Sequence, residues 1–230
     1  MLELRDLSVR RGGFALRADI GIEAGSRVAV IGASGSGKST LLSLIAGFLA
    51  PDGGRILWEG RDITPIPPGR RPVSVLFQDQ NLFPHLTAAQ NVGLGLRPDL
   101  RLSQGEKVRV GQVLEQVGLA GMEERRPANL SGGQQSRVAL ARVLLRARPV
   151  LLLDEPFAAL GPALKTEMLH LLDRISAETG ATVLMVTHDP ADARAFAPLT
   201  VLIEDGAAHP PVPTGPLLDD PPPGLRAYLG

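Results

Sequence analysis

The stretch "GASGSGKST", Gly32 to Thr40, has the residue types and the spacing that bind a chain of phosphates. It consists of a glycine, four residues and then Gly-Lys-Ser, between an apolar run and an apolar helical segment. Glycines let backbone N–H groups wrap phosphate oxygens, Lys38 offers a compact positive charge, and Ser39 offers a hydroxyl to Mg²⁺. The sequence therefore predicts a nucleotide site formed by Gly32, Ala33, Ser34, Gly35, Ser36, Gly37, Lys38, Ser39 and Thr40.

Two adjacent carboxylates, Asp154 and Glu155, end the apolar run "VLLLD". Such a pair at a sheet edge is costly without a counter-charge. A Mg²⁺ ion held near Ser39 would provide that charge, with Asp154 ordering the metal's waters and Glu155 acting as general base on an attacking water. The alternative is an acidic pair in a loop, with both charges in solvent.

Two further polar residues, His188 in "VTHDP" and Gln78 in "LFQDQ", also follow apolar runs. Ligands of α/β sheets bind at the carboxyl ends of the strands, which favours a catalytic role for His188 over a structural one. The amide of Gln78 could reach Mg²⁺ or water, although an exposed loop glutamine is the default interpretation. The predicted catalytic set is Glu155, His188 and Gln78, and the predicted metal set is Ser39, Gln78 and Asp154.

The stretch "NLSGGQQSR", Asn129 to Arg137, is a second candidate anion site. Small residues and a hydroxyl immediately before a helix bring backbone N–H groups and a helix N-terminus against an anion. The sequence alone does not say which anion this is, or what supplies the rest of its site.

The elements around these motifs predict an α/β fold. Residues 2–9 and 15–22 alternate between apolar and polar, as antiparallel strands do, whereas the runs at 27–32, 73–77, 150–154 and 182–188 are continuously apolar. Helical spacing relates Val110, Val113, Leu114 and Val117, and also Leu164, Met168, Leu171, Leu172 and Ile175. We expect a mostly parallel sheet with helices on both faces, an antiparallel N-terminal β subdomain and a helical subdomain at about 84–145. The proline-rich tail, 207–230, is expected to be irregular.

Composition narrows the class of protein. The 230 residues include no cysteine, which excludes disulfides, thiolate metal sites and cysteine nucleophiles. The 24 basic and 24 acidic residues balance, so the broad positive field used in nonspecific nucleic-acid binding is not expected. The N-terminus has no apolar core of a secretory signal, and no run of eighteen apolar residues occurs. We therefore expect a soluble chain that reaches a membrane only through a partner.

Taken in order, these motifs resemble those of ABC transporter ATP-binding subunits. The resemblance covers residues 1–206 and implies a P-loop NTPase core with ATP and Mg²⁺ as ligands. It also implies that "LSGGQ" of one chain closes over ATP held by the phosphate loop of a second copy, through Ser131, Gly132, Gly133 and Gln134. The further partners implied are a transmembrane permease and, indirectly, a periplasmic solute-binding protein, with the subunit peripheral on the cytoplasmic face of the inner membrane.

Within this family, "IAGFLAPDGG", "PPGRRPVSVLFQ" and "NLFPHLTAAQNVGLGL" look most similar to the ATPases of bacterial thiamine importers. Import of another small solute, such as an anion, a metal or a polyamine, is an alternative. A second alternative is an ABC ATPase of DNA repair or translation, and a third is a regulator that binds nucleotide without turnover. Glu155 argues against the third.

Two positions depart from the family pattern. Where an aromatic residue usually stacks on adenine, the ungapped alignment places Arg11, with Phe14 nearby. A guanidinium can also stack on a purine, but simple exposure of Arg11 is equally expected. In "AALG" the usual aspartate is replaced by Gly161, which predicts altered communication between the two sites of a dimer.

Overall fold

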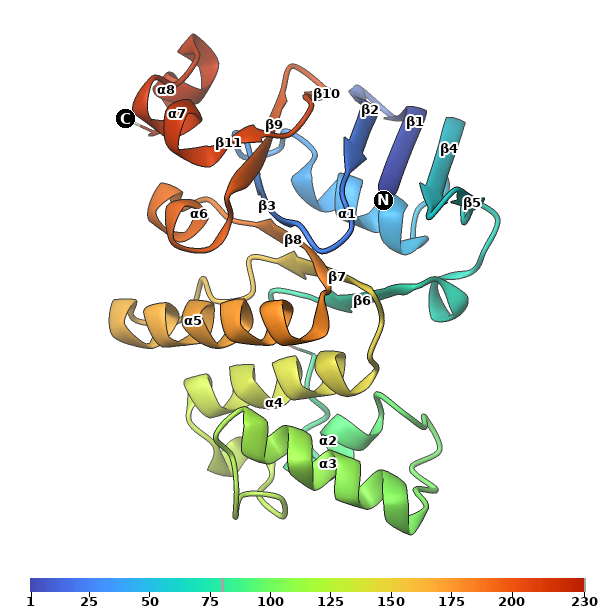
Figure 1. The fold of residues 1–230 in the computed structure, drawn as a ribbon, viewed down its shortest axis with the longest axis vertical. Coiled ribbons are helices and arrows are strands. Elements are labelled where there is room, and N and C mark those ends of the chain that lie inside the picture. The colour runs from blue at the N-terminus through green and yellow to red at the C-terminus, as the bar shows by residue number, and fades with distance from the viewer. Residues whose placement is uncertain (80, 230) are drawn as a thin grey trace.

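The computed structural model describes residues 1–79 and 81–229. Its centre is a parallel sheet in the order β9 (Leu199–Glu204), β3 (Arg27–Ile31), β8 (Thr182–Val186), β7 (Val150–Asp154) and β6 (Val73–Leu76) (Figure 1). In β3, Val28 and Val30 belong to one hydrophobic core, and Ala29 and Ile31 belong to the other. Both faces of the sheet are therefore covered, which explains the continuously apolar runs.

Helices cover the two faces of this sheet. Helix α1 (Lys38–Ala46) packs into the core that contains Val28 and Val30. Helices α5 (Pro162–Thr179) and α6 (Pro190–Phe196) pack into the opposite core, through residues such as Met168 and Phe196. The predicted α/β class is confirmed.

The antiparallel strands at the N-terminus are also confirmed. The strands β1 (Leu2–Arg11) and β2 (Phe14–Ile22) form a hairpin in which Arg11 pairs with Phe14. On the other side of β1 lie β4 (Gly53–Trp58) and β5 (Arg61–Asp62), two strands that the sequence analysis did not predict. The short helix η1 (Pro68–Arg70) then leads into β6.

Residues 84–145 form α2 (Ala88–Gly93), α3 (Gln104–Gln116), η2 (Pro127–Asn129) and α4 (Gly132–Leu145), at the lower end of Figure 1. None of the described residues in this range lies in a strand. The three α-helices are N-capped by Thr87, Ser103 and Ser131, and each of these side chains forms a capping box with the third helical residue.

The expectation of an irregular tail is wrong. Residues 207–229 contain β10 (Ala207–Ala208), β11 (Val212–Pro213), α7 (Thr214–Asp219) and α8 (Pro223–Leu229). Pro223 is the first residue of α8, where a helix needs no N–H donor, and Pro213 lies in a two-residue strand at the end of a pairing. The prolines thus occupy positions that regular structure tolerates, and Leu225 is buried in the core.

No helix within residues 1–79 and 81–229 is both long enough and apolar enough to cross a membrane.

Candidate functional site

The phosphate loop joins the end of β3 to the start of α1. Gly35 and Gly37 have φ values of 76° and 109°, a region of backbone space that favours glycine. A side chain at Gly32 would clash with the carbonyl of Ile203 and with the hydroxyl of Ser36. The buried Oγ of Ser36 has no hydrogen-bond partner among the described residues. The loop therefore has the close backbone packing and the spare polar group expected of an anion cradle.

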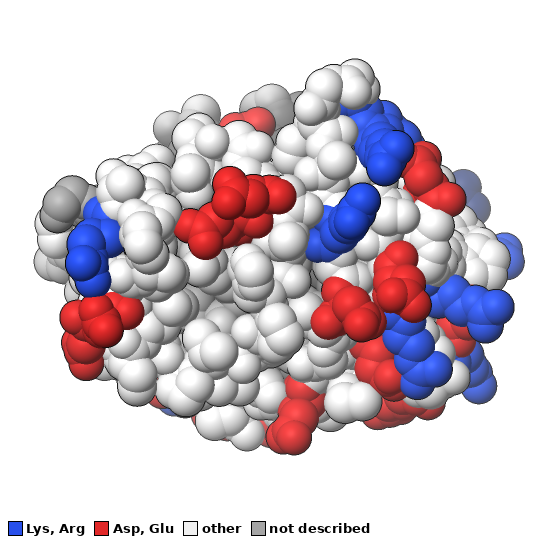
Figure 2. Space-filling model, turned by 90° about the horizontal axis from the view of Figure 1, so that it is seen from above, with Lys and Arg blue, Asp and Glu red and all other residues white. Residues whose placement is uncertain are grey.

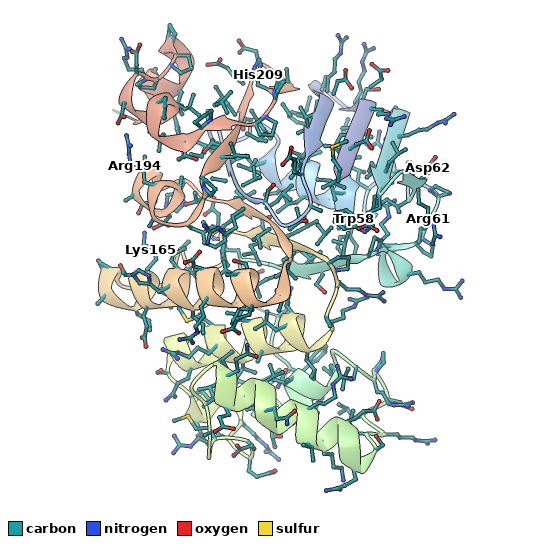
Figure 3. All side chains as sticks on the ribbon, viewed as in Figure 1. Trp58, Arg61, Asp62, Lys165, Arg194 and His209 are labelled. Carbon is teal, nitrogen blue, oxygen red and sulfur yellow. The ribbon has the colours of Figure 1, made fainter. Side chains whose placement is uncertain are left out.

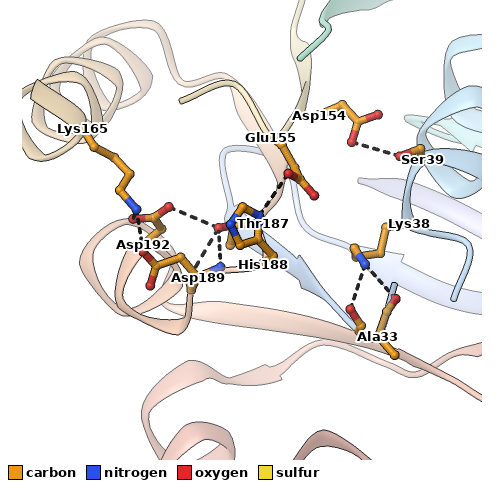
Figure 4. Close-up of polar contacts among 11 residues, drawn as sticks. Ala33, Lys38, Ser39, Asp154, Glu155, Lys165, Thr187, His188, Asp189 and Asp192 are labelled. Carbon is orange, nitrogen blue, oxygen red and sulfur yellow. Dashed lines mark hydrogen bonds and ion pairs between the residues drawn. The ribbon is translucent and has the colours of Figure 1, made fainter. Parts of the chain in front are cut away.

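Lys38 is held inside this loop. Its Nζ donates to the carbonyl oxygens of Gly32 at 2.7 Å and Ala33 at 2.9 Å, and the residue is 8% exposed (Figure 4). Burial lowers the pKa of Lys38, although the carboxylates of Glu155 and Asp154 partly oppose this effect. The ammonium group is thus bonded to neutral carbonyls, which a phosphate group could replace with a stronger charged partner.

Asp154 meets Ser39 at the carboxyl edge of the parallel sheet. The hydroxyl of Ser39 donates to Oδ1 of Asp154 at 3.1 Å (Figure 4). The pKa of Asp154 is raised, chiefly by burial, while the bond from Ser39 acts in the opposite direction. A partly buried carboxylate beside a hydroxyl is a suitable pair of oxygen ligands for Mg²⁺.

Glu155 and His188 come from neighbouring strands. Oε2 of Glu155 lies 3.0 Å from Nδ1 of His188 (Figure 4), and the N–H of Glu155 donates to the carbonyl of Val186. Glu155 has φ 46°, which is sparsely populated for a residue with a side chain and is typical of functional sites. The strand ends therefore bring together the predicted general base and the predicted catalytic histidine.

Phe14, rather than Arg11, faces the phosphate loop. Phe14 lines a cavity of about 370 Å³ together with Ser34, Gly35, Gly37, Lys38, Ser39, Thr40 and Glu155. A Cβ placed on Gly37 would lie 2.7 Å from Cζ of the Phe14 ring. Arg11 instead donates to Oδ1 of Asp52 at 3.0 Å and to the carbonyl of Ala50 at 3.2 Å. Arg11 therefore lies on the surface with a partner of its own, away from this cavity.

Gln78 is exposed and lies just after the end of β6. Because β6, β7 and β8 are parallel, Gln78 is at the same edge of the sheet as Asp154 and His188. It does not line the cavity that contains Lys38 and Glu155.

The "LSGGQ" stretch lies at the start of α4 and does not line that cavity either. Ser131 caps the helix: its Oγ accepts from the N–H of Gln134 at 3.3 Å, and its own N–H donates to Oε1 of Gln134 at 2.9 Å. Gly132 is exposed, and Gly133 is buried. Within one chain, the exposed start of this helix thus lies apart from the phosphate-loop cavity.

The structure also adds residues that the sequence analysis missed. Gly224 and Leu225 of α8 line a cavity of about 550 Å³ together with Gly32, Ala33, Ser34, Gly35 and Ser36. The pKa of Tyr228, also on α8, is raised by burial and by the Glu155 carboxylate. The apolar residues of "PGLRAYL" are a signal for a packed helix, although the neighbouring prolines obscure it.

The sequence profile of the family described as "ABC transporter" matches residues 17–158. The chain is 66% identical over all 230 residues to the thiamine import ATP-binding protein ThiQ of Cereibacter sphaeroides, and all of both chains is covered. It is 50% identical over 219 residues to the protein of the same name from Yersinia pseudotuberculosis, covering 95% of this chain and 93% of that one.

A solved structure is similar over nearly the whole fold. It is described as the dimeric, post-hydrolysis state of an ATP-binding cassette bound to ADP and Pi. Its TM-score is 0.79 with 30% sequence identity, and the comparison covers 93% of this chain and 99% of that chain.

Proposed function

The chain belongs to the ABC transporter family, and from this premise we propose that it is the ATP-hydrolysing subunit of an importer that takes up thiamine. The observation that carries the proposal is the convergence of Lys38, Ser39, Asp154, Glu155 and His188 at one edge of the parallel sheet. The 66% identity to a thiamine import protein over the full chain supports the choice of cargo.

The loop fits a triphosphate. Its glycines allow close approach of the backbone, and within residues 1–79 and 81–229 the hydroxyl of Ser36 has no hydrogen-bond partner. The ammonium group of Lys38 donates to two neutral carbonyls, which a phosphate group could replace. Phe14, rather than Arg11, provides the face on which adenine stacks, because its ring borders the same cavity as Lys38.

Hydrolysis follows from the placement of Glu155. Its carboxylate accepts a proton from a water molecule as the water oxygen attacks the γ-phosphorus, and the bond to the leaving ADP oxygen breaks. His188 holds this carboxylate through the 3.0 Å contact at Nδ1. Lys38 and the loop N–H groups stabilise the charge on the phosphate oxygens.

Ser39 and Asp154 fit Mg²⁺, with the amide of Gln78 as a third oxygen donor at the same sheet edge. Bound there, Mg²⁺ would neutralise charge on the phosphate oxygens. The hydroxyl and carboxylate are already 3.1 Å apart, and both are oxygen donors, the type of ligand that this ion prefers.

A second copy of the chain completes each site. The phosphate loop and the "LSGGQ" helix start are separate half-sites in one chain, so two chains related by a twofold axis would hold two ATP molecules head to tail. Ser131, Gly132, Gly133 and Gln134 of one copy then face the γ-phosphate held by the other. The similar solved structure is itself described as dimeric.

The permease docks beside the loop from Gln78 to Asn91, in which Gln80 lies outside the described residues. Phe48, Phe77 and Phe83 are 57%, 37% and 46% exposed, and the rings of Phe48 and Phe77 lie 5.7 Å apart. A groove of about 430 Å³ near α2 and α3 is lined by both apolar and polar residues, among them Leu102 and Lys107. Exposed apolar side chains such as these phenylalanines mark a protein-interaction site. Because it docks on a membrane permease, the subunit is peripheral on the cytoplasmic face of the inner membrane. The periplasmic thiamine-binding protein acts on it only through the permease.

On the face drawn in Figure 2, basic and acidic side chains are interspersed among uncharged ones. With 24 basic and 24 acidic residues in the sequence, the chain also lacks the excess of positive charge that nonspecific nucleic-acid binding uses.

The proposal is tested by phosphate release in vesicles that contain the permease, with thiamine-loaded binding protein inside. ATP turnover should rise when thiamine is present, and Lys38→Ala should abolish it. Stimulation by a different solute would overturn the choice of cargo, and stimulation by DNA or ribosomes would overturn the transport function. Unchanged ATP binding and turnover in Lys38→Ala would overturn the phosphate-loop assignment.

A further inference from the structure

Lys165, on the first turn of α5, contacts the carboxylates of Asp189 and Asp192, which closely follow His188 in the chain (Figure 4). Its Nζ lies 2.5 Å from Oδ2 of Asp189 and 3.1 Å from Oδ1 of Asp192. The three side chains are only 19%, 32% and 15% exposed, so water competes less with these ion pairs than with pairs on the open surface. The chemistry described above does not use Lys165.

The two carboxylates are bonded in turn to the backbone segment around His188. The hydroxyl of Thr187 donates to Oδ2 of Asp192 at 3.2 Å, and it accepts from the N–H of Asp189 at 3.1 Å. The other oxygen of Asp189 caps the first turn of α6. The network that starts at Lys165 therefore reaches the residues immediately before and after His188, whose ring contacts Glu155.

The first two turns of α5 also contact α4, the helix that starts with the "LSGGQ" stretch. Leu164 packs against Gly133 so closely that a Cβ at Gly133 would clash with its Cδ2. One turn later, Oε1 of Glu167 lies 2.6 Å from the guanidinium of Arg137. By contrast, Gly161 precedes α5 without a side-chain cap. The position of the start of α5 thus depends on these lateral contacts.

We propose that the first two turns of α5 rigidly connect the "LSGGQ" helix to the His188 segment, with Lys165 as the residue that positions His188. The inference rests on the proposed function, because in a head-to-tail dimer His188 and Ser131 of one chain serve different ATP molecules. The connector then links the two ATP sites within each chain. Consistent with this, the hydrogen bond from Lys165 lowers the pKa of Asp189 and so keeps it charged.

The test compares Lys165→Met with Lys165→Arg in steady-state ATP hydrolysis by the full-length protein. A displacement of about 1 Å in a catalytic group can cost on the order of 100-fold in rate. We expect Lys165→Met to lower kcat by about 10- to 100-fold while KM for ATP changes less than about 2-fold, because the phosphate loop is untouched. Lys165→Arg should restore most of the rate, because a guanidinium can also span the two carboxylates.

The matched control is Arg194→Met. Arg194 lies on α6, the helix that carries Asp192 (Figure 3), and pairs with Asp219 at 2.5 Å, but both side chains of this pair are exposed, at 43% and 70%. Its loss should leave kcat unchanged. A Lys165→Met protein with parental kcat, or a fall equal to that in Arg194→Met, would overturn the inference.

A second measurement separates misplacement from misfolding. In a Glu155→Gln background, Lys165→Met should still bind ATP and dimerise, since Lys38 and Ser131 are intact. Loss of ATP binding would indicate general damage to the fold and would overturn a specific positioning role. If the parent protein itself releases no phosphate from ATP, the proposed function fails. If the parent turns over and only the Lys165 comparison fails, the inference alone is wrong.

The proposed coupling between the two ATP sites can be measured separately, through the cooperativity of hydrolysis. In the parent, occupancy of one site influences the other through α5, so the ATP dependence of hydrolysis should have a Hill coefficient above that of Lys165→Met. Equal coefficients would contradict the connecting role, even if kcat falls.

Discussion

Oε2 of Glu155 lies 3.0 Å from Nδ1 of His188, and this contact joins the ends of the neighbouring strands β7 and β8. The two side chains reach each other although 33 positions separate them in the sequence. The contact fixes the carboxylate that the proposed mechanism uses as a base, so each partner can be tested separately from nucleotide binding.

Glu155→Gln should lower the rate of ATP hydrolysis by about 10²- to 10⁴-fold, the usual cost of losing a general base. Glutamine keeps the shape of the side chain and removes a negative charge near the γ-phosphate. The variant should therefore be a monomer without nucleotide and a dimer with ATP, as measured by light scattering after gel filtration, with Na⁺ in place of Mg²⁺ to suppress residual turnover.

Adding Ser131→Arg to Glu155→Gln should abolish the dimer, because a bulky cation would occupy the place of the γ-phosphate, while ATP binding through Lys38 persists. Ser103→Arg is the matched control, since Ser103 caps α3 with the same capping box. A Ser131→Arg double variant that still dimerises with ATP would show that "LSGGQ" is not the second half of the site.

Phe14→Ala should weaken ATP binding by about 5- to 150-fold, since stacking a base on an aromatic ring contributes about 1–3 kcal/mol. Arg11→Ala should bind ATP like the parent, because Arg11 is paired with Asp52. Titration calorimetry with ATP distinguishes the two. An equal loss of ATP affinity in both variants would show that Arg11 also contacts the adenine base.

Asp154→Asn should raise the Tm of the nucleotide-free protein at neutral pH, while hydrolysis is lost. Burial raises the folded-state pKa of Asp154 above its unfolded value, so the charged form destabilises the fold above that folded pKa. The difference in Tm between variant and parent should shrink as the pH falls through the raised folded-state pKa. It should vanish below about 3.9, the pKa of an aspartate in the unfolded chain.

The opposite sign is expected for Asp189→Asn, which serves as the control. The bond from Lys165 lowers the pKa of Asp189, so its stabilising contribution is complete above the unfolded value and is lost as the pH falls through the lowered pKa. Asp189→Asn should therefore lower the Tm at neutral pH. A rise in both variants would point to a general effect of removing negative charge.

Gly161→Asp should increase the cooperativity of hydrolysis in ATP, seen as a higher Hill coefficient than in the parent. Gly161 has φ −65° and ψ 158°, and no atom of the described residues lies within 4 Å of an added Cβ, so the carboxylate fits and can cap α5. Gly161→Ala adds the Cβ without the carboxylate and should leave the coefficient unchanged. Identical curves for all three proteins would mean that this position does not couple the sites.

Leu225→Ala should destabilise the protein by roughly 2–4 kcal/mol, as expected for a buried leucine. Leu225 is 2% exposed and lines a cavity together with the phosphate loop, so ATP affinity should fall as well. Denaturant unfolding and ATP titration measure the two effects. The neighbouring exposed Arg226→Ala is the control, and equal behaviour of the two variants would show that α8 is not part of the core.

The sequence predicted the parallel sheet because a strand buried on both faces must be continuously apolar, as in Val150 to Leu153. It also predicted the residues at the strand ends, since parallel strands bring Asp154 and His188 to one edge. It could not decide between Arg11 and Phe14. These two residues pair across the tight turn of a hairpin, and which of them faces the phosphate loop depends on how the hairpin sits against α1.

The sequence also did not predict contacts between segments that are far apart along the chain. Lys165 and Asp189 are 24 positions apart, and no local pattern relates a lysine on one helix to a carboxylate before the next. The tail was misjudged because prolines disfavour helix interiors, whereas here Pro223 stands at a helix start.

Tyr228 is the only tyrosine in the chain, so the packing of α8 has an optical consequence. Its pKa is raised by burial and by the negative charge of Glu155. The ultraviolet absorbance of its phenolate, followed as the pH rises, should therefore respond both to the packing of α8 and to the charge of Glu155. The unlabelled protein thus offers a spectroscopic signal for the docking of its C-terminal helix.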